Sequence, residues 1–189
     1  AALAAYNELE AAIGSHKQAG DNISYGADLA SMADSAISNQ SQILTRMREL
    51  AVQSGNGTLD PSSRTAIENE FSALRDELDR VSSTTEFNDT PLLQGDTIEI
   101  QAGIDSSSAS RIDIPLPDTQ ATSLGLDQIS LGTQSGAQDA LATIDDAINT
   151  LGNAQAALGA SSNRLEFAES INTTMQINKA ESASAIGEA

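Results

Sequence analysis

The stretch Leu141-Ala-Thr-Ile-Asp-Asp-Ala-Ile-Asn-Thr-Leu-Gly-Asn-Ala-Gln-Ala-Ala-Leu-Gly-Ala-Ser-Ser-Asn-Arg-Leu165 carries the strongest structural pattern in the chain. Its apolar residues recur alternately three and four positions apart, which is the spacing of a helix face that packs along another helix. The stripe consists of Leu141, Ile144, Ile148, Leu151, Gln155, Leu158, Ser162 and Leu165, and Ala168, Ile171 and Met175 continue it. Because this pattern spans at least five heptads without a proline, we predict a long helix over residues 137–189.

The first 54 residues carry a second pattern of the same kind. Its stripe consists of Leu29, Met32, Ala36, Ile43, Met47, Leu50 and Ser54, with Asn39 or Gln40 filling the gap. We predict one long helix over residues 1–54. Gly14, Gly20 and Gly26 leave a break near Gly20-Asp21-Asn22 open as the alternative, because each costs about 1 kcal/mol relative to alanine in a helix interior. They could equally mark places where another backbone comes close.

Residues that favour the end of one helix and the start of another separate this helix from the next. Gly55-Asn56-Gly57 favours the left-handed conformation that ends helices. Asp60 and Pro61 then fit the N-cap and the first helical position, and we predict a helix over residues 60–82. Its apolar stripe is Ile67, Phe71, Leu74, Leu78 and Val81. The short connection requires this helix to lie antiparallel to the first.

After a predicted loop over residues 82–94, the apolar period changes to two. Ile98, Ile100 and Ala102 alternate with polar residues, and so do Ile112, Ile114 and Leu116 after a polar turn. This pattern predicts a β-hairpin over residues 97–117 with one buried face. Pro115 and Pro117 place its second strand at an edge.

These elements together predict the fold class. The chain is expected to be mainly α, a single domain over residues 1–189 with two long antiparallel helices, one shorter helix and a β-hairpin. At 1.5 Å per residue, each long helix would extend on the order of 80 Å if unbroken. The expected shape is therefore an elongated rod, held together by seams like those of coiled coils.

Composition excludes several functional classes. The chain has 9 Lys and Arg against 27 Asp and Glu, a net charge of −18, which disfavours binding to nucleic acid. It has no Cys and a single His, His16, so thiol catalysis and multi-histidine metal sites are excluded. No apolar run is long enough to span a membrane. Because Ala1 opens in helix-forming sequence without Met, the sequence is interpreted as a trimmed fragment.

No arrangement of residues predicts catalysis, a cofactor or a metal site. Asp145-Asp146 and the pair Glu166 and Glu169 fit a solvated helix surface better than an acid–base pair. Asp105 precedes three serines but lacks the alternating carboxylates of a calcium loop. We therefore predict that the chain is not an enzyme.

The most distinctive surface feature lies near the end of the first helix. Arg46, Glu49 and Gln53 share an exposed stripe beside the seam residues Met47 and Leu50. One interpretation is a binding surface, and the other is a helix end whose arginines offset the acidic second helix. The two interpretations are compatible.

Five segments, in order along the chain, resemble those of bacterial flagellin. The segment Arg46-Met-Arg-Glu-Leu-Ala-Val-Gln-Ser-Gly-Asn-Gly57 is similar to the most recognisable flagellin motif. The others are Leu74-Arg-Asp-Glu-Leu-Asp-Arg-Val-Ser82 with Thr85-Glu-Phe-Asn88 and Leu92-Leu93; Ile98-Glu-Ile-Gln-Ala-Gly103; Thr122-Ser-Leu-Gly-Leu-Asp127; and Leu158-Gly-Ala-Ser-Ser-Asn-Arg-Leu165. Their order over almost the whole chain makes the resemblance specific.

The resemblance implies a structural subunit of the flagellar filament, secreted to the cell exterior for motility. Its partners would be other flagellin subunits, as a homopolymer, and an export chaperone, with neither nucleic acid nor membrane. The family's terminal inner-tube segments and variable outer domain would be missing from this stretch. Without that outer domain, in which some flagellins carry a protease, nothing supports an enzyme. The alternatives are a flagellar hook–filament junction protein and an innate-immune receptor-binding module.

The resemblance also implies a receptor-binding surface. Some flagellins are recognised by the flagellin-sensing Toll-like receptor of animals, and the family's contact positions correspond to Arg46, Leu50 and Glu70. Arg48, Glu49 and Gln53 would flank that surface.

Overall fold

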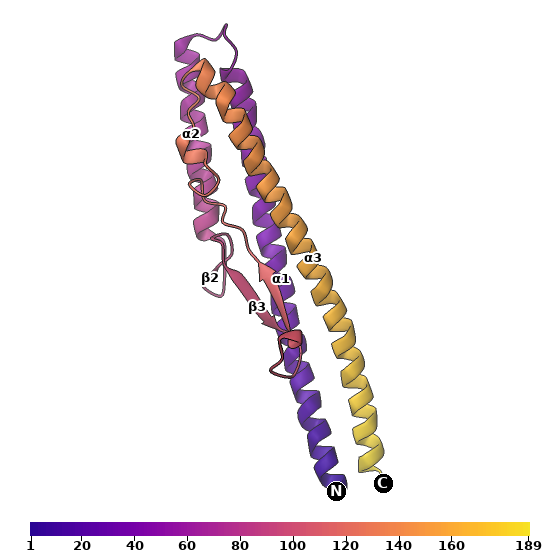
Figure 1. Cartoon of the computed structure of the whole chain (residues 1–189). Coiled ribbons are helices and arrows are strands. Elements are labelled where there is room, and N and C mark those ends of the chain that lie inside the picture. The colour runs from indigo at the N-terminus through magenta and orange to yellow at the C-terminus, as the bar shows by residue number, and fades with distance from the viewer. The chain divides into compact units, whose positions relative to one another are not determined.

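The computed structural model describes all residues, 1–189, and is dominated by three helices (Figure 1). These are α1 (Ala2–Ser54), α2 (Pro61–Thr84) and α3 (Gln134–Gly187). The chain divides into two compact units, which are described separately. Unit 1 comprises residues 1–30, 97–114 and 158–189, and unit 2 comprises residues 31–96 and 115–157. The mainly α fold class predicted from the sequence is confirmed, and α1 has no break near Gly20.

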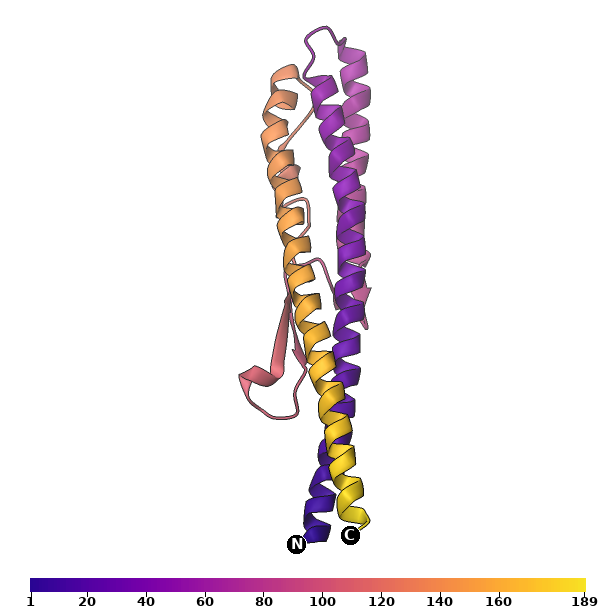
Figure 2. The same cartoon turned by 90° about the vertical axis from the view of Figure 1, so that its right-hand side faces the viewer.

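In unit 1 the N-terminal part of α1 packs antiparallel to the C-terminal part of α3. Gly187 lies beside the ring of Tyr6, and the His16 side chain is hydrogen-bonded to Asn172. Figure 1 and Figure 2 both show the two helices side by side here, with the two chain termini at the same end. The predicted antiparallel pairing therefore holds within this unit.

The predicted β-hairpin consists of β3 (Thr97–Gln101) and β4 (Arg111–Pro115). On the side of the turn, the backbone amide of Ala102 donates to the Ser110 carbonyl at 2.8 Å. At the other end of the strand pair, the backbone amide of Leu116 donates to the Asp96 carbonyl at 2.9 Å. These bonds pair the strands antiparallel, as the alternation of residues predicted. The short 3₁₀ turn η1 (Ser108–Ser110) leads into β4.

Gly26 allows this hairpin to lie against α1. A Cβ atom at Gly26 would come within 2.9 Å of Ile100 Cγ1 and 3.3 Å of Leu165 Cδ1. The side-chain amide of Asn22 also donates to the backbone carbonyl of Gln101 at 3.2 Å. The second interpretation of the glycines, close approach of another element, thus applies to Gly26.

In unit 2 the second half of α1 turns back into α2, as predicted. Asp60 caps α2 by accepting a hydrogen bond from the Ser63 amide at 2.7 Å, and Pro61 occupies the first turn. The pKa of Asp60 lies below its ordinary value because this bond favours the carboxylate. α2 continues two residues beyond the predicted end, to Thr84, and α3 begins at Gln134, three residues before residue 137.

The predicted seam of α1 needs correction. Met32 is exposed and Ile43 is only half-buried, whereas Ala33, Ile37 and Leu44 are buried. In unit 2 this part of α1 has a partner on two sides. The Gln40 amide donates to the Leu78 carbonyl of α2, and Ser38 accepts from Gln155 of α3. The buried face therefore turns toward both neighbours instead of following a single heptad seam.

The predicted continuation of the α3 seam is also wrong at two positions. Ile171 and Met175 are exposed, and the buried residue in that turn is Asn172. Asn172 follows the buried Leu165 by seven residues, so the structure keeps the helical period, while the prediction followed the apolar side chains. Hydrogen bonds to His16 make the burial of this polar side chain possible.

The predicted loop over residues 82–94 contains a small hairpin of β1 (Glu86–Phe87) and β2 (Thr90–Pro91). The two residues between the strands, Asn88 and Asp89, have φ angles of 48° and 62°. Asn and Asp tolerate this left-handed conformation, which the tightest hairpin turns require.

Three charged residues of α2 hold the segment between the hairpin and α3. The Ala121 amide donates to Asp79, Arg75 donates to the Leu126 carbonyl, and the Leu131 amide donates to Glu68. The segment also includes the 3₁₀ turn η2 (Leu126–Gln128). Leu124, Leu126 and Leu131 are buried and anchor the segment, and Ile129 is half-buried.

Candidate functional site

The surface predicted around Arg46 lies in unit 2, where α1 and α2 run side by side. The guanidinium of Arg46 binds both carboxylate oxygens of Glu70, from Nε at 2.9 Å and from Nη2 at 3.2 Å. Its Nη1 donates to Glu49 at 3.1 Å. Hydrogen bonding to Glu70, and then to Glu49, holds the pKa of Arg46 above its ordinary value. About half of the Arg46 and Glu70 side chains is exposed, so the pair presents a charged surface of defined geometry.

Arg48, predicted as a flanking surface residue, links α1 to α3. Its Nε donates to Asp145 Oδ1 at 2.6 Å, and its Nη2 approaches Oδ2 at 3.4 Å. The hydrogen bond from Arg48 lowers the pKa of Asp145, and the same bond raises the pKa of Arg48. Asp145 therefore belongs to an ion pair between helices, a partner that the sequence did not identify.

Leu50 lies beneath this surface instead of on it. Its side chain is 1% exposed, in the same buried face as Met47 and Ala51. Glu49 and Gln53 are exposed, as predicted. The structure thus brings Arg46, Glu49 and Glu70 together, and it places Leu50 as their support.

Sequence reasoning missed an apolar neighbour of these charges. Val52 is 52% exposed and lines a groove of about 310 Å³ with Thr45, Arg48 and Glu49. The signal was present, because Val52 follows Glu49 by three residues and Arg48 by four, the spacings of helix neighbours.

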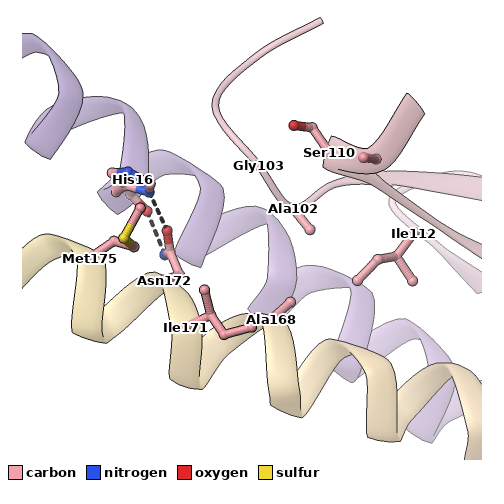
Figure 3. Close-up of a pocket in the computed structure, with 10 residues that line it drawn as sticks. His16, Ala102, Gly103, Ser110, Ile112, Ala168, Ile171, Asn172 and Met175 are labelled. Carbon is pink, nitrogen blue, oxygen red and sulfur yellow. Dashed lines mark hydrogen bonds between the residues drawn. The ribbon is translucent and has the colours of Figure 1, made fainter. Parts of the chain in front are cut away.

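In unit 1, His16 is a buried seam residue, and it lines a cavity of about 240 Å³ (Figure 3). The Asn172 amide donates to the His16 carbonyl at 2.6 Å, which turns its oxygen toward His16 Nδ1 at 2.8 Å. Because a carbonyl oxygen only accepts, Nδ1 is the donor in this hydrogen bond. This pair stabilises the contact between α1 and α3.

The chain has no cluster of three or more His, Asp or Glu side chains that could hold a metal ion. None of its helices is long and apolar enough to cross a membrane.

Comparisons with known proteins identify the family of the chain. Residues 1–97 match the family profile described as the bacterial flagellin N-terminal helical region. The chain belongs to the bacterial flagellin family. A flagellin of Halalkalibacterium halodurans is 34% identical over 88% of the chain and 62% of the relative. A flagellin of Listeria monocytogenes is 35% identical over 90% of the chain and 65% of the relative. The chain thus spans somewhat less than two thirds of these flagellins.

Solved structures extend the flagellin likeness to the fold. The crystal structure of Bacillus cereus flagellin matches with a TM-score of 0.69 and 28% identity, over 80% of this chain and 88% of that chain. A putative flagellar hook-associated protein from Vibrio parahaemolyticus matches with a TM-score of 0.77 over 95% of both chains. At 15% identity, this second likeness concerns the fold alone.

Proposed function

We propose that this flagellin-family chain is the core of a structural subunit of the bacterial flagellar filament. In this role it assembles with other copies of itself outside the cell and serves motility. The observation that carries the proposal is the family match over residues 1–97, together with relatives named flagellin that align along about 90% of the chain. The proposal contains no catalytic step and needs no cofactor.

Electron microscopy tests this role. The natural protein that carries this chain is produced in bacterial cells that lack their own filament protein, and the cells are imaged after negative staining. We expect long tubular filaments and recovered swimming. A flagellar hook–filament junction protein, which the family resemblance leaves open, is the alternative. Immunogold label confined to the hook–filament junction, with no filament made of this protein, would support that alternative and contradict the proposal.

We further propose that the surface formed by Arg46, Glu49 and Glu70 is recognised by the flagellin-sensing Toll-like receptor. Support comes from the exposed, doubly hydrogen-bonded pair of Arg46 and Glu70, the residue types that the family resemblance implies. Gln53 extends the exposed surface, and the buried Leu50 holds its backbone in place. An export chaperone, also implied by the resemblance, stays a prediction.

Receptor signalling in reporter cells tests this surface. Arg46→Ala and Glu70→Ala should each weaken signalling several-fold with little change in thermal stability, because exposed ion pairs contribute little to folding. The matched control is Arg80→Ala, which removes an exposed ion pair with Glu77 on α2. If all three variants signal alike, or the unmodified chain does not signal, the receptor proposal is wrong. Leu50→Ala is unsuitable because truncating a buried leucine costs about 2–5 kcal/mol of stability.

A further inference from the structure

In unit 1, α3 presents an apolar strip that no part of the unit covers. The strip consists of Phe167, Ile171 and Met175, which are 71%, 64% and 41% exposed. They follow one another at four-residue spacing and so share one side of the helix. The whole chain has only two tyrosines and three phenylalanines. One of these few aromatic side chains, Phe167, is exposed instead of contributing to the core. A contiguous exposed apolar surface of this kind marks an interaction site.

Two of the three residues of the apolar strip lie at a cavity of about 240 Å³ (Figure 3). Ile171 and Met175 line it from α3, and Gly103, Ser110 and Ile112 line it from the hairpin. An apolar cavity of about 150 Å³ is enough to hold a benzene ring. A single aromatic side chain from outside therefore fits here, with the polar groups of the hairpin turn in reach of a hydroxyl.

Both ends of the apolar strip carry a cation. Arg164 precedes Phe167 by three residues, and Lys179 follows Met175 by four. Neither forms an ion pair, whereas Arg46, Arg48, Arg80 and Arg111 all do. At about 100° per residue, Glu166 and Glu169 project from other sides of α3. In a chain of net charge −18, these two unpaired cations at the ends of the apolar strip favour acidic side chains on the partner.

The chain itself carries a surface of the complementary kind on α1. Tyr25 is 55% exposed, and the exposed Asp21 and Asp28 lie about one turn before and after it. We call these three residues the acidic patch. Lys17, one turn before Asp21, is the nearest cation on this side of α1. By helical geometry the patch lies opposite the buried Ile23 and so faces outward.

We propose that the apolar strip on α3 of one copy docks on the acidic patch on α1 of a second copy. In this arrangement Tyr25 of one copy enters the cavity beside Ile171 of the other copy. Asp21 and Asp28 of the first copy then face Arg164 and Lys179 of the second. A tyrosine suits such a site because its ring is apolar and its hydroxyl can form a hydrogen bond. The inference rests on the proposed filament function, because it names the surfaces through which copies would meet.

The position of the two surfaces determines the kind of assembly. They are different surfaces of one chain, so the contact is heterologous. After two copies have joined, the first still has a free acidic patch and the second a free apolar strip. Contacts of this type propagate into rings or open helical filaments instead of closing as dimers. The proposed contact thus allows growth by repeated addition of identical subunits.

Disulfide trapping tests the contact directly. Because the chain has no Cys, two introduced thiols are the only ones present. Ser24→Cys copies, in which the thiol lies next to an intact Tyr25, are mixed at equal concentration with Ile171→Cys copies of different mass and oxidised gently. We expect a mixed disulfide dimer at least about tenfold above that of a control mixture of Ser24→Cys with Glu166→Cys, an exposed position on another side of α3. Circular dichroism checks that each variant is folded.

A second experiment reverses the charges at the proposed contact. Arg164→Glu with Lys179→Glu should lower trapping about tenfold, because like charges across an interface are strongly unfavourable. Pairing that variant with copies that carry Asp21→Lys and Asp28→Lys should restore the trapping, because opposite charges then face each other again. Equal trapping in the Ile171→Cys and Glu166→Cys mixtures, or no response to charge reversal, overturns the inference.

The outcomes also separate this inference from the proposed function. Cells that form filaments, combined with unselective trapping, overturn the docking surfaces and leave the filament role intact. Selective trapping in a protein that forms no filaments supports the docking surfaces and overturns the filament role.

Discussion

Adding one methyl group to α1 at Gly26 tests whether the β-hairpin packs where the structure places it. The new Cβ of Gly26→Ala would lie 2.9 Å from Ile100 Cγ1, 3.2 Å from Ile100 Cδ1 and 3.3 Å from Leu165 Cδ1. Carbon atoms in contact normally lie about 3.5–4.0 Å apart. Cγ1 lies next to the branched Cβ of Ile100, which restricts its rotation. The hairpin, and not a flexible side-chain end, must therefore move.

Two effects of opposite sign determine the result. Replacing glycine by alanine inside a helix stabilises by about 1 kcal/mol. Overpacking a well-filled contact costs roughly 1–3 kcal/mol. We therefore expect Gly26→Ala to lower the free energy of unfolding by about 1 kcal/mol, because a mid-range overpacking cost of about 2 kcal/mol exceeds the propensity gain of about 1 kcal/mol.

Gly14→Ala is the matched control on the same helix and in the same unit. No atom lies within 4 Å of the position that its added methyl group would occupy, so only the propensity gain of about 1 kcal/mol remains. The two variants should differ by about 2 kcal/mol, which corresponds to roughly 4–8 °C in melting temperature for a chain of this length.

Urea unfolding provides the measurement, with circular dichroism for helix content and tyrosine fluorescence as a local reporter. Tyr6 and Tyr25 are the only tyrosines, both lie in unit 1, and the chain has no tryptophan. If Gly26→Ala stabilises the chain as much as Gly14→Ala, the hairpin does not contact α1 at this position and the packing argument is refuted.

Three further predictions concern other parts of the chain. Gln40→Ala should destabilise by about 2 kcal/mol because it removes buried hydrogen bonds to Leu78 and Ser82; urea unfolding against the exposed control Gln42→Ala measures this, and equal stabilities would contradict it. Hydrogen bonds from Ser107 and then Ser110 lower the pKa of Asp105 to about 2 from the ordinary 3.8, so the turn is stabilised above pH 4 and loses that stabilisation as pH falls toward 2. The Ser107 amide chemical shift should titrate with that midpoint, and Asp105→Asn should abolish the titration. Small-angle X-ray scattering tests the elongated rod predicted from the helix lengths, which a compact profile would contradict.

The elements themselves could be predicted from local patterns. Gly55-Asn56-Gly57 ends α1, and Asp60 with Pro61 begins α2, because capping depends on residues a few positions apart. The period of two predicted the β3–β4 hairpin for the same reason. The β1–β2 hairpin was missed, since Asn88-Asp89 lacks the glycine that usually signals such a turn.

The candidate site was predicted only in part. The sequence and its family resemblance identified Arg46 and Glu70, but not that they bind each other across α1 and α2. The apolar stripe correctly indicated that Leu50 lies in the buried seam, but neither source revealed that Arg48 is paired with Asp145. Both pairings depend on contacts between residues far apart in the chain, and periodicity carries no information about them.

The resemblance of five segments indicated the family, and local sequence patterns were enough to establish the number, kind and approximate bounds of the helices and of the larger hairpin. Short-range chemistry is sufficient for that, because capping, turn preference and apolar period act over a few residues. Which side of each helix is buried emerged only from the packed structure. Met32 and Ile171 are as apolar as Ile37, yet they are exposed, and the polar Asn172 is buried. The reason is that burial depends on which neighbours a helix face meets: α1 meets two helices in unit 2, and Asn172 meets His16, which satisfies its hydrogen bonds.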